Sequence, residues 1–100
     1  MHVISVGLCE DDAELRSVLG RALDTEGFEV RATATGHDAV EQFSSDPPDV
    51  LVLDIGLRDA DGRDVCQALR ANAVDAPVLF LTARGALTDR LAGFGAGGDD

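Results

Sequence analysis

The sequence contains no lysine, so all eight of its basic residues are arginine. Acidic residues outnumber them 19 to 8, and the formal net charge of -11 predicts that this chain does not bind nucleic acid directly, because it would be repelled by the phosphates. No apolar run approaches the roughly 20 residues of a membrane span, and no charged start leads into the apolar core of a signal peptide. We therefore expect a cytoplasmic chain that makes no contact with a membrane.

Cysteine is also scarce, and its placement excludes two kinds of site. Cys9 and Cys66 each lie in an apolar segment, at no spacing typical of metal ligands. They predict neither a disulfide framework nor a zinc site, and we expect both to be buried, reduced thiols that contribute to packing. The chain has 100 residues, of which 45% are hydrophobic. This is enough for one compact domain over residues 1–100.

Short apolar segments of strand length alternate with helical patterns along the whole chain. Each strand segment is rich in β-branched or large apolar residues, and the central ones are apolar at every position, which is typical of strands buried on both faces. The expected strands span residues 3–9, 28–34, 50–53 and 78–82.

Apolar residues at steps of three and four predict a helix after each strand. Gly27 is expected to end the first helix, and the prolines at 47 and 48 to end the second. The apolar faces are formed by Leu15, Val18, Leu19, Ala22 and Leu23; by Ala39, Val40 and Phe43; by Val65, Cys66 and Leu69 within residues 63–71; and by Leu87, Leu91 and Phe94. Four strand–helix units predict an α/β fold, with a parallel sheet covered by helices on both faces.

Polar residues follow the predicted strands where ligands bind in such sheets, beyond the carboxyl ends. The first strand runs into Glu10, Asp11 and Asp12, and the third ends at Asp54. Two carboxylates about 4 Å apart repel by roughly 4 kcal/mol at an effective dielectric constant of about 20. A hard divalent cation would offset this repulsion, and two or three carboxylates with water suit Mg²⁺ better than a full Ca²⁺ cage.

Helix capping is the alternative interpretation of these acids. Asp11 or Asp12 can cap the first helix, and Glu14, three residues after Asp11, matches a capping box. Capping is the favoured interpretation of Asp12, whereas a cap and a binding site both remain open for Glu10 with Asp11. Asp54 lies between apolar neighbours, where a cap is less expected, and this favours a site.

These residues together resemble the receiver domain of bacterial two-component response regulators. The resemblance depends on the acid pair at 10 and 11, on Asp54 in "LVLDIGLRDADG", on the Asp61-Gly62 turn and on the Thr82-Ala83 pair in "FLTAR". The segments "DGRDVCQALR" and "LTAR" are most similar to the branch whose receivers precede winged-helix DNA-binding domains. The resemblance implies a flavodoxin-like doubly wound sheet with strand order 2-1-3-4.

The resemblance also implies the chemistry of the acids. Asp54 would accept phosphate from a histidine kinase as an acyl phosphate. Asp11 and Asp54 would bind Mg²⁺ directly, Glu10 would bind it through water, and the backbone carbonyl of Gly56 would add another oxygen. The cation would offset charge during transfer of the phosphoryl group.

The same resemblance assigns the switch to the end of the fourth strand. The Thr82 hydroxyl would hydrogen-bond a phosphoryl oxygen, and the backbone N–H of Ala83 would assist. The resulting change of shape would pass to an effector domain, expected to bind DNA, in the intact protein.

The chain departs from the family pattern at three points. Arg58 occupies the place of a usual proline, from which we expect a changed loop rather than lost chemistry. The family's phosphate-pairing lysine has no counterpart, and Arg84 is a weak stand-in. The family continues past Asp100 with a fifth strand and a fifth helix, so we expect a chain that is incomplete at its carboxyl end and that self-associates as a dimer or swapped oligomer.

Two other functions remain open at this point. Because the chain has the acids but no lysine, it could be an interaction module that cannot be phosphorylated. A Mg²⁺-dependent phosphohydrolase is less favoured, because such enzymes typically carry a second aspartate two residues after the nucleophile, where this chain has Gly56. We expect a regulatory domain and not an enzyme.

Overall fold

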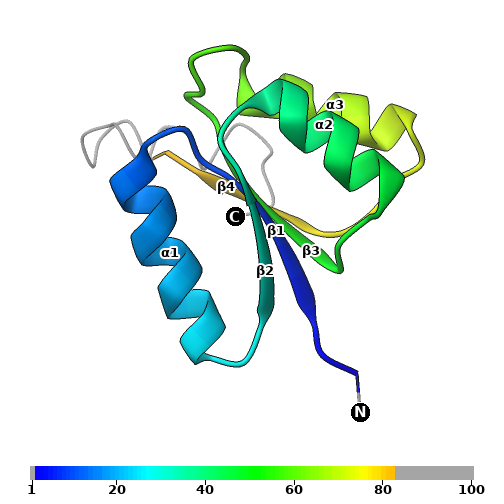
Figure 1. The fold of residues 1–100 in the computed structure, drawn as a ribbon. Coiled ribbons are helices and arrows are strands. Elements are labelled where there is room, and N and C mark those ends of the chain that lie inside the picture. The colour runs from blue at the N-terminus through cyan, green and yellow to red at the C-terminus, as the bar shows by residue number, and fades with distance from the viewer. Residues whose placement is uncertain (1, 83–100) are drawn as a thin grey trace.

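The computed structural model describes residues 2–82, and within them the fold is a four-stranded parallel sheet (Figure 1). The strands lie in the order β2-β1-β3-β4, as predicted. Their bounds are β1 (Ser5–Cys9), β2 (Glu29–Thr33), β3 (Val50–Asp54) and β4 (Val78–Leu81). The connecting helices are α1 (Ala13–Thr25), α2 (Gly36–Ser45) and α3 (Gly62–Ala71). The predicted fourth helix, with Leu87, Leu91 and Phe94, lies outside the described residues.

Helices cover both faces of the sheet, and each face has its own core. Helix α1 lies on one face, while α2 and α3 lie side by side on the other (Figure 1). Successive strand residues point to opposite faces, so a strand between two helical layers must be apolar at every position. In β3, Val52 belongs to the core that Leu19 and Leu23 of α1 cover, and Leu51 and Leu53 belong to the core under α2 and α3.

The helix ends show which capping interpretation is correct. The Asp12 carboxylate accepts a hydrogen bond from the backbone N–H of Leu15 at 3.0 Å, so Asp12 is the N-cap of α1, as predicted. The capping box between Asp11 and Glu14 is wrong, because the helix begins one residue later than that pairing requires. The Asp11 side chain therefore does not cap α1 and can contact other residues. At the other end of α1, Gly27 has a φ of 96°, a left-handed conformation that favours glycine, and the predicted stop is confirmed.

Two smaller predictions need correction. The first strand begins at Ser5, because its pairing with β2 begins with Ser5 opposite Glu29, and Val3 is exposed. Cys9 is buried as predicted, but Cys66 on α3 is only half-buried at the edge of the core. Of the helices within residues 2–82, none has the length and apolar character needed to span a membrane.

Candidate functional site

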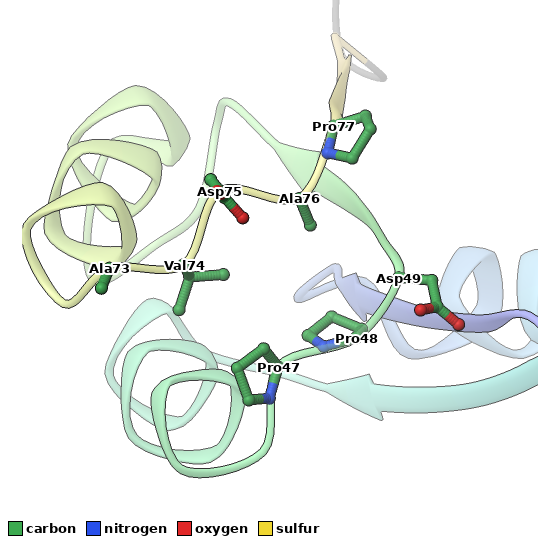
Figure 2. A pocket seen from close by; sticks show the side chains of 8 residues that line it. All are labelled: Pro47, Pro48, Asp49, Ala73, Val74, Asp75, Ala76 and Pro77. Carbon is green, nitrogen blue, oxygen red and sulfur yellow. The ribbon is translucent and has the colours of Figure 1, made fainter.

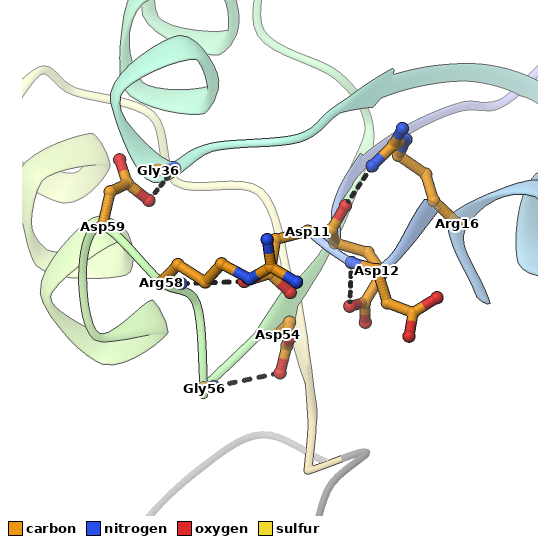
Figure 3. Close-up of polar contacts among 9 residues, drawn as sticks. Asp11, Asp12, Arg16, Gly36, Asp54, Gly56, Arg58 and Asp59 are labelled. Carbon is orange, nitrogen blue, oxygen red and sulfur yellow. Dashed lines mark hydrogen bonds and ion pairs between the residues drawn. The ribbon is translucent and has the colours of Figure 1, made fainter. Parts of the chain in front are cut away.

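Three of the predicted acids meet at the carboxyl edge of the sheet (Figure 3). Strands β1 and β3 are neighbours, with Cys9 opposite Leu53. Glu10 and Asp11 follow the end of β1, and Asp54 is the last residue of β3, so all three share one edge. One carboxylate oxygen from each lies within 4.8 Å of those of the other two. Parallel pairing of neighbouring strands thus produces the cluster that the sequence predicts.

Glu10 is the most deeply buried member of this acidic cluster, with an exposed fraction of 1%. Its Oε2 accepts a hydrogen bond from the backbone N–H of Asp12 at 3.0 Å, whereas its buried Oε1 has no hydrogen-bond partner among the described residues. Burial raises the pKa of Glu10 to about 7, and the nearby charge of Asp54 adds to this shift against the opposing Asp12 hydrogen bond. Burying an oxygen atom without a hydrogen-bond partner costs free energy. Binding of a cation or a proton at Oε1 would therefore be favourable.

The turn that follows β3 contacts both the side chain and the backbone of Asp54. Asp54 is only 3% exposed, and its Oδ1 accepts a hydrogen bond from the backbone N–H of Gly56 at 3.0 Å. Gly62 packs directly on the Asp54 backbone: a Cβ atom there would lie 2.2 Å from the Asp54 carbonyl oxygen. Gly62 also donates its N–H to the carbonyl of Ile55 at 2.9 Å. Only glycine lets the start of α3 approach the acid this closely.

Asp11 contacts the loop after β3 and not the helix that follows it. Its Oδ2 accepts a hydrogen bond from the backbone N–H of Arg58 at 2.8 Å, and the Arg58 Nε lies 3.8 Å from the same oxygen (Figure 3). The Asp11 side chain is 9% exposed and the Arg58 side chain 85% exposed. A basic side chain therefore lies at the rim of the acidic cluster.

Asp59 was not identified from the sequence, although it fixes the same loop. Its carboxylate accepts hydrogen bonds from the backbone N–H groups of Gly36 at 2.9 Å and His37 at 3.1 Å, at the start of α2. These two bonds hold the pKa of Asp59 below its usual value. Acids are favoured at helix N-termini. Here the helix begins 23 residues before the acid, so no local pattern in the sequence reveals the contact.

The structure says less about the remaining predicted site residues. Thr82 directly follows β4 and is half-buried, and its neighbour Leu81 is paired with Asp54 in the sheet, so Thr82 lies at the same edge. Its role as a phosphate contact stays a prediction, as does the metal contact of the Gly56 carbonyl. Ala83 and Arg84 lie outside the described residues.

Two other features of the described residues do not belong to this site. His37, Asp38 and Glu41 bring ligand atoms together near the start of α2, on side chains exposed to solvent or nearly so. A cavity of about 360 Å³ is lined by residues 47–49 and 73–77 (Figure 2). These segments precede β3 and β4, so the cavity lies at the amino ends of the strands, opposite to the acidic cluster.

Comparison with known proteins agrees with this geometry. A family model described as "Response regulator receiver domain" matches residues 6–100. The chain is 40% identical over 97 residues to "Response regulator MprA" of Mycobacterium ulcerans, an alignment that covers 97% of this chain and 42% of the relative. It is 42% identical over 91 residues to the protein of the same name from Mycobacterium avium, covering 91% of this chain and 40% of the relative.

A solved structure is similar over nearly the same range. The HemR receiver domain of Leptospira biflexa, in its non-phosphorylated form, superposes with a TM-score of 0.76 at 32% identity, covering 95% of this chain and 77% of that one. This chain spans about two fifths of the length of the curated relatives that it matches.

Proposed function

This chain belongs to the response regulator receiver domain family, and from that membership we propose that it is a phosphoaccepting switch of a two-component system. In this proposal Asp54 accepts phosphate from a histidine kinase. The Asp54 carboxylate forms a bond to phosphorus, the bond from phosphorus to the kinase imidazole breaks, and its electron pair stays on the imidazole nitrogen. The product is an acyl phosphate on Asp54.

The observation that carries this proposal is the meeting of Glu10, Asp11 and Asp54, together with a buried Glu10 oxygen that has no hydrogen-bond partner among residues 2–82. Repulsion of roughly 4 kcal/mol between two such carboxylates is a substantial fraction of the roughly 5 to 15 kcal/mol that stabilise a folded domain. An arrangement of this kind is expected where function requires negative charge at one point.

The donor set fits Mg²⁺, because every side-chain ligand is a carboxylate oxygen and hard cations prefer oxygen. Asp11 and Asp54 would bind the ion directly, Glu10 through water, and Gly56 through its backbone carbonyl. When bound, the ion would offset negative charge on the phosphoryl group during transfer. The chain itself contributes the Gly56 N–H, which fixes the rotation of the Asp54 carboxylate, and the burial that keeps Asp54 away from bulk water.

Thr82 and Ala83 would carry the signal outward. The Thr82 hydroxyl would donate to a phosphoryl oxygen, and the Ala83 backbone N–H would assist. A phosphoryl group adds charge and strong acceptors at one point, which can bias a two-state loop. The position of Thr82 directly after the strand that pairs with Asp54 supports this role.

One competing function is favoured by a specific observation. Arg58 already lies at the Asp11 carboxylate, as would suit an interaction module that is not phosphorylated. Hydrolysis of outside substrates is less favoured, because Gly56 offers no side chain for proton transfer. Receiver domains are regulatory signalling domains and not classical enzymes.

Incubation with Mg²⁺ and acetyl phosphate separates these functions. We expect the intact chain to gain a phosphoryl group that is stable in acid and labile in base, detected by mass spectrometry. Asp54→Asn should abolish it. Asp12→Asn is the matched control, because asparagine caps a helix as well as aspartate does and the net charge changes equally.

Other results would favour the alternatives. Consumption of acetyl phosphate without a trapped product would indicate hydrolysis. Absence of modification in a folded chain that binds Mg²⁺ would favour the inert module, and equal modification of the Asp54→Asn variant would refute Asp54 as the acceptor.

The wider setting is also a proposal. We expect a cytoplasmic protein whose effector domain binds DNA, while the net charge of -11 argues against nucleic acid binding by this chain itself. Self-association stays a prediction, which residues 2–82 do not test.

A further inference from the structure

Arg58 makes two contacts with one oxygen of the acidic cluster. Its backbone N–H donates to Asp11 Oδ2 at 2.8 Å, and its Nε lies 3.8 Å from that oxygen. Proline, the residue usual at this place in the family, has no N–H and could not make the first contact. The main-chain bond fixes the start of the side chain beside Asp11, so the guanidinium stays near the cluster although it is exposed.

We propose that Arg58 sets the cation affinity of the acidic cluster, by acting as a resident positive charge at Asp11 that a divalent cation must oppose. The inference rests on the proposed function, in which Glu10, Asp11 and Asp54 bind Mg²⁺. Arg58 is a positioning and affinity-setting residue and does not bind the ion itself. It thereby raises the Mg²⁺ concentration at which the site fills.

The charge balance of the cluster gives this proposal its direction. In the cation-free chain, the guanidinium reduces repulsion among the carboxylates. When a divalent cation binds Asp11, the same guanidinium faces a second positive charge and loses part of its attraction to the carboxylate. Both effects weaken cation binding. Because Arg58 is 85% exposed, water and salt screen them strongly, and the expected effect is modest.

Magnesium titration of the intact chain by isothermal calorimetry tests the proposal. Arg58→Gln replaces the guanidinium with an uncharged polar group and retains the backbone N–H. We expect it to lower the Kd for Mg²⁺ about five-fold, equivalent to about 1 kcal/mol, and the difference should narrow as salt is added. Arg58→Lys keeps the charge and should stay within about two-fold of the unaltered chain.

Arg21→Gln is the matched control. Arg21 is exposed on α1, away from the cluster, and its replacement changes the net charge equally. Its Kd should equal that of the unaltered chain. The inference is overturned if Arg58→Gln leaves the Kd unchanged or raises it, or if Arg21→Gln lowers the Kd as much.

The proposed function fails in a different way. If no folded variant binds Mg²⁺ at all, the cation site itself is wrong, and the role of Arg58 is refuted with it. If every variant binds Mg²⁺ with the same Kd, only the role of Arg58 is refuted. Because Arg58 is exposed, Arg58→Gln should fold normally, and circular dichroism verifies this.

Discussion

Replacement of Gly62 by alanine gives a direct test of how β3 is joined to α3. A Cβ atom at 62 would lie 2.2 Å from the Asp54 carbonyl oxygen and 2.8 Å from the Asp54 carbonyl carbon. Both atoms belong to the main chain, so no flexible side chain can rotate away. The turn must open by several tenths of an ångström or more, and this movement must include the backbone of Asp54.

The expected cost follows from that displacement. Overpacking against a rigid neighbour typically costs about 1 to 3 kcal/mol. Alanine gains little helix propensity here, because residue 62 is the first residue of α3. We expect Gly62→Ala to lower the free energy of unfolding by about 2 kcal/mol, which corresponds to roughly 10 °C in Tm for a domain of this size.

Gly20→Ala is the matched control, because the same methyl group is added with the opposite effect. Gly20 lies inside α1, and a Cβ atom there would meet nothing within 4 Å. Alanine in a helix interior is favoured over glycine by about 0.5 to 1 kcal/mol, so this variant should be more stable. The sequence has no tryptophan or tyrosine, so thermal and urea unfolding are best followed by far-ultraviolet circular dichroism.

The Mg²⁺ affinity of the two variants adds a second measurement. Gly62→Ala should also bind Mg²⁺ more weakly, because the backbone that moves carries Asp54, whereas Gly20→Ala should bind it normally. If Gly62→Ala is as stable as the unaltered chain, the close approach of α3 to Asp54 does not exist as described. If it is unstable but binds Mg²⁺ with full affinity in its folded state, the turn does not position the acid.

Two further predictions concern pH. Because the pKa of Glu10 is raised to about 7, the folded chain retains a proton that the unfolded chain releases, so without metal the stability should fall as pH rises from about 4.5 to 7. Glu10→Gln should remove most of this slope in urea unfolding at pH 5 and pH 7, and an unchanged slope would contradict the assignment. The pKa of Asp59 is lowered by the N–H groups of Gly36 and His37, so its stabilisation is present above the unfolded pKa and is lost as pH falls through the folded one. Asp59→Asn should therefore cost less than about 1 kcal/mol at pH 7, since the group is exposed, and nothing at pH 2; an equal cost at both would refute the charge-based explanation.

The fold was predictable because its signals are local and agree with one another. The run from Val50 to Leu53 has no polar position, which already implies a strand between two helical layers, and the structure confirms this. Acids directly after two such strands must then meet if the strands are neighbours. The sequence alone supports neighbouring strands only through the resemblance to receiver domains, and the pairing of β1 with β3 confirms it.

Two contacts of the loop after β3 were not predictable, because each joins residues distant in the sequence. Asp59 reaches the start of α2, and Arg58 reaches Asp11, which lies 47 positions earlier. The wrong capping box has a related cause. Asp11 and Asp12 are both aspartates and either could cap a helix; in the structure Asp12 caps α1, while Asp11 contacts the distant Arg58.

Taken together, the contacts explain how the cluster is tolerated without a metal ion. Each acid has its own source of stabilisation. The raised pKa of Glu10 favours a bound proton, the Asp11 carboxylate lies next to the Arg58 guanidinium, and the Asp54 carboxylate accepts a hydrogen bond from the Gly56 N–H. These sources differ in strength, because an exposed guanidinium is screened by water and a backbone N–H carries only a partial charge. A divalent cation would have to displace a proton from Glu10 and oppose the Arg58 guanidinium. In the function proposed above, Glu10 and Arg58 would therefore lower the affinity of the cluster for Mg²⁺, while the Gly56 N–H holds the Asp54 carboxylate that would accept phosphate.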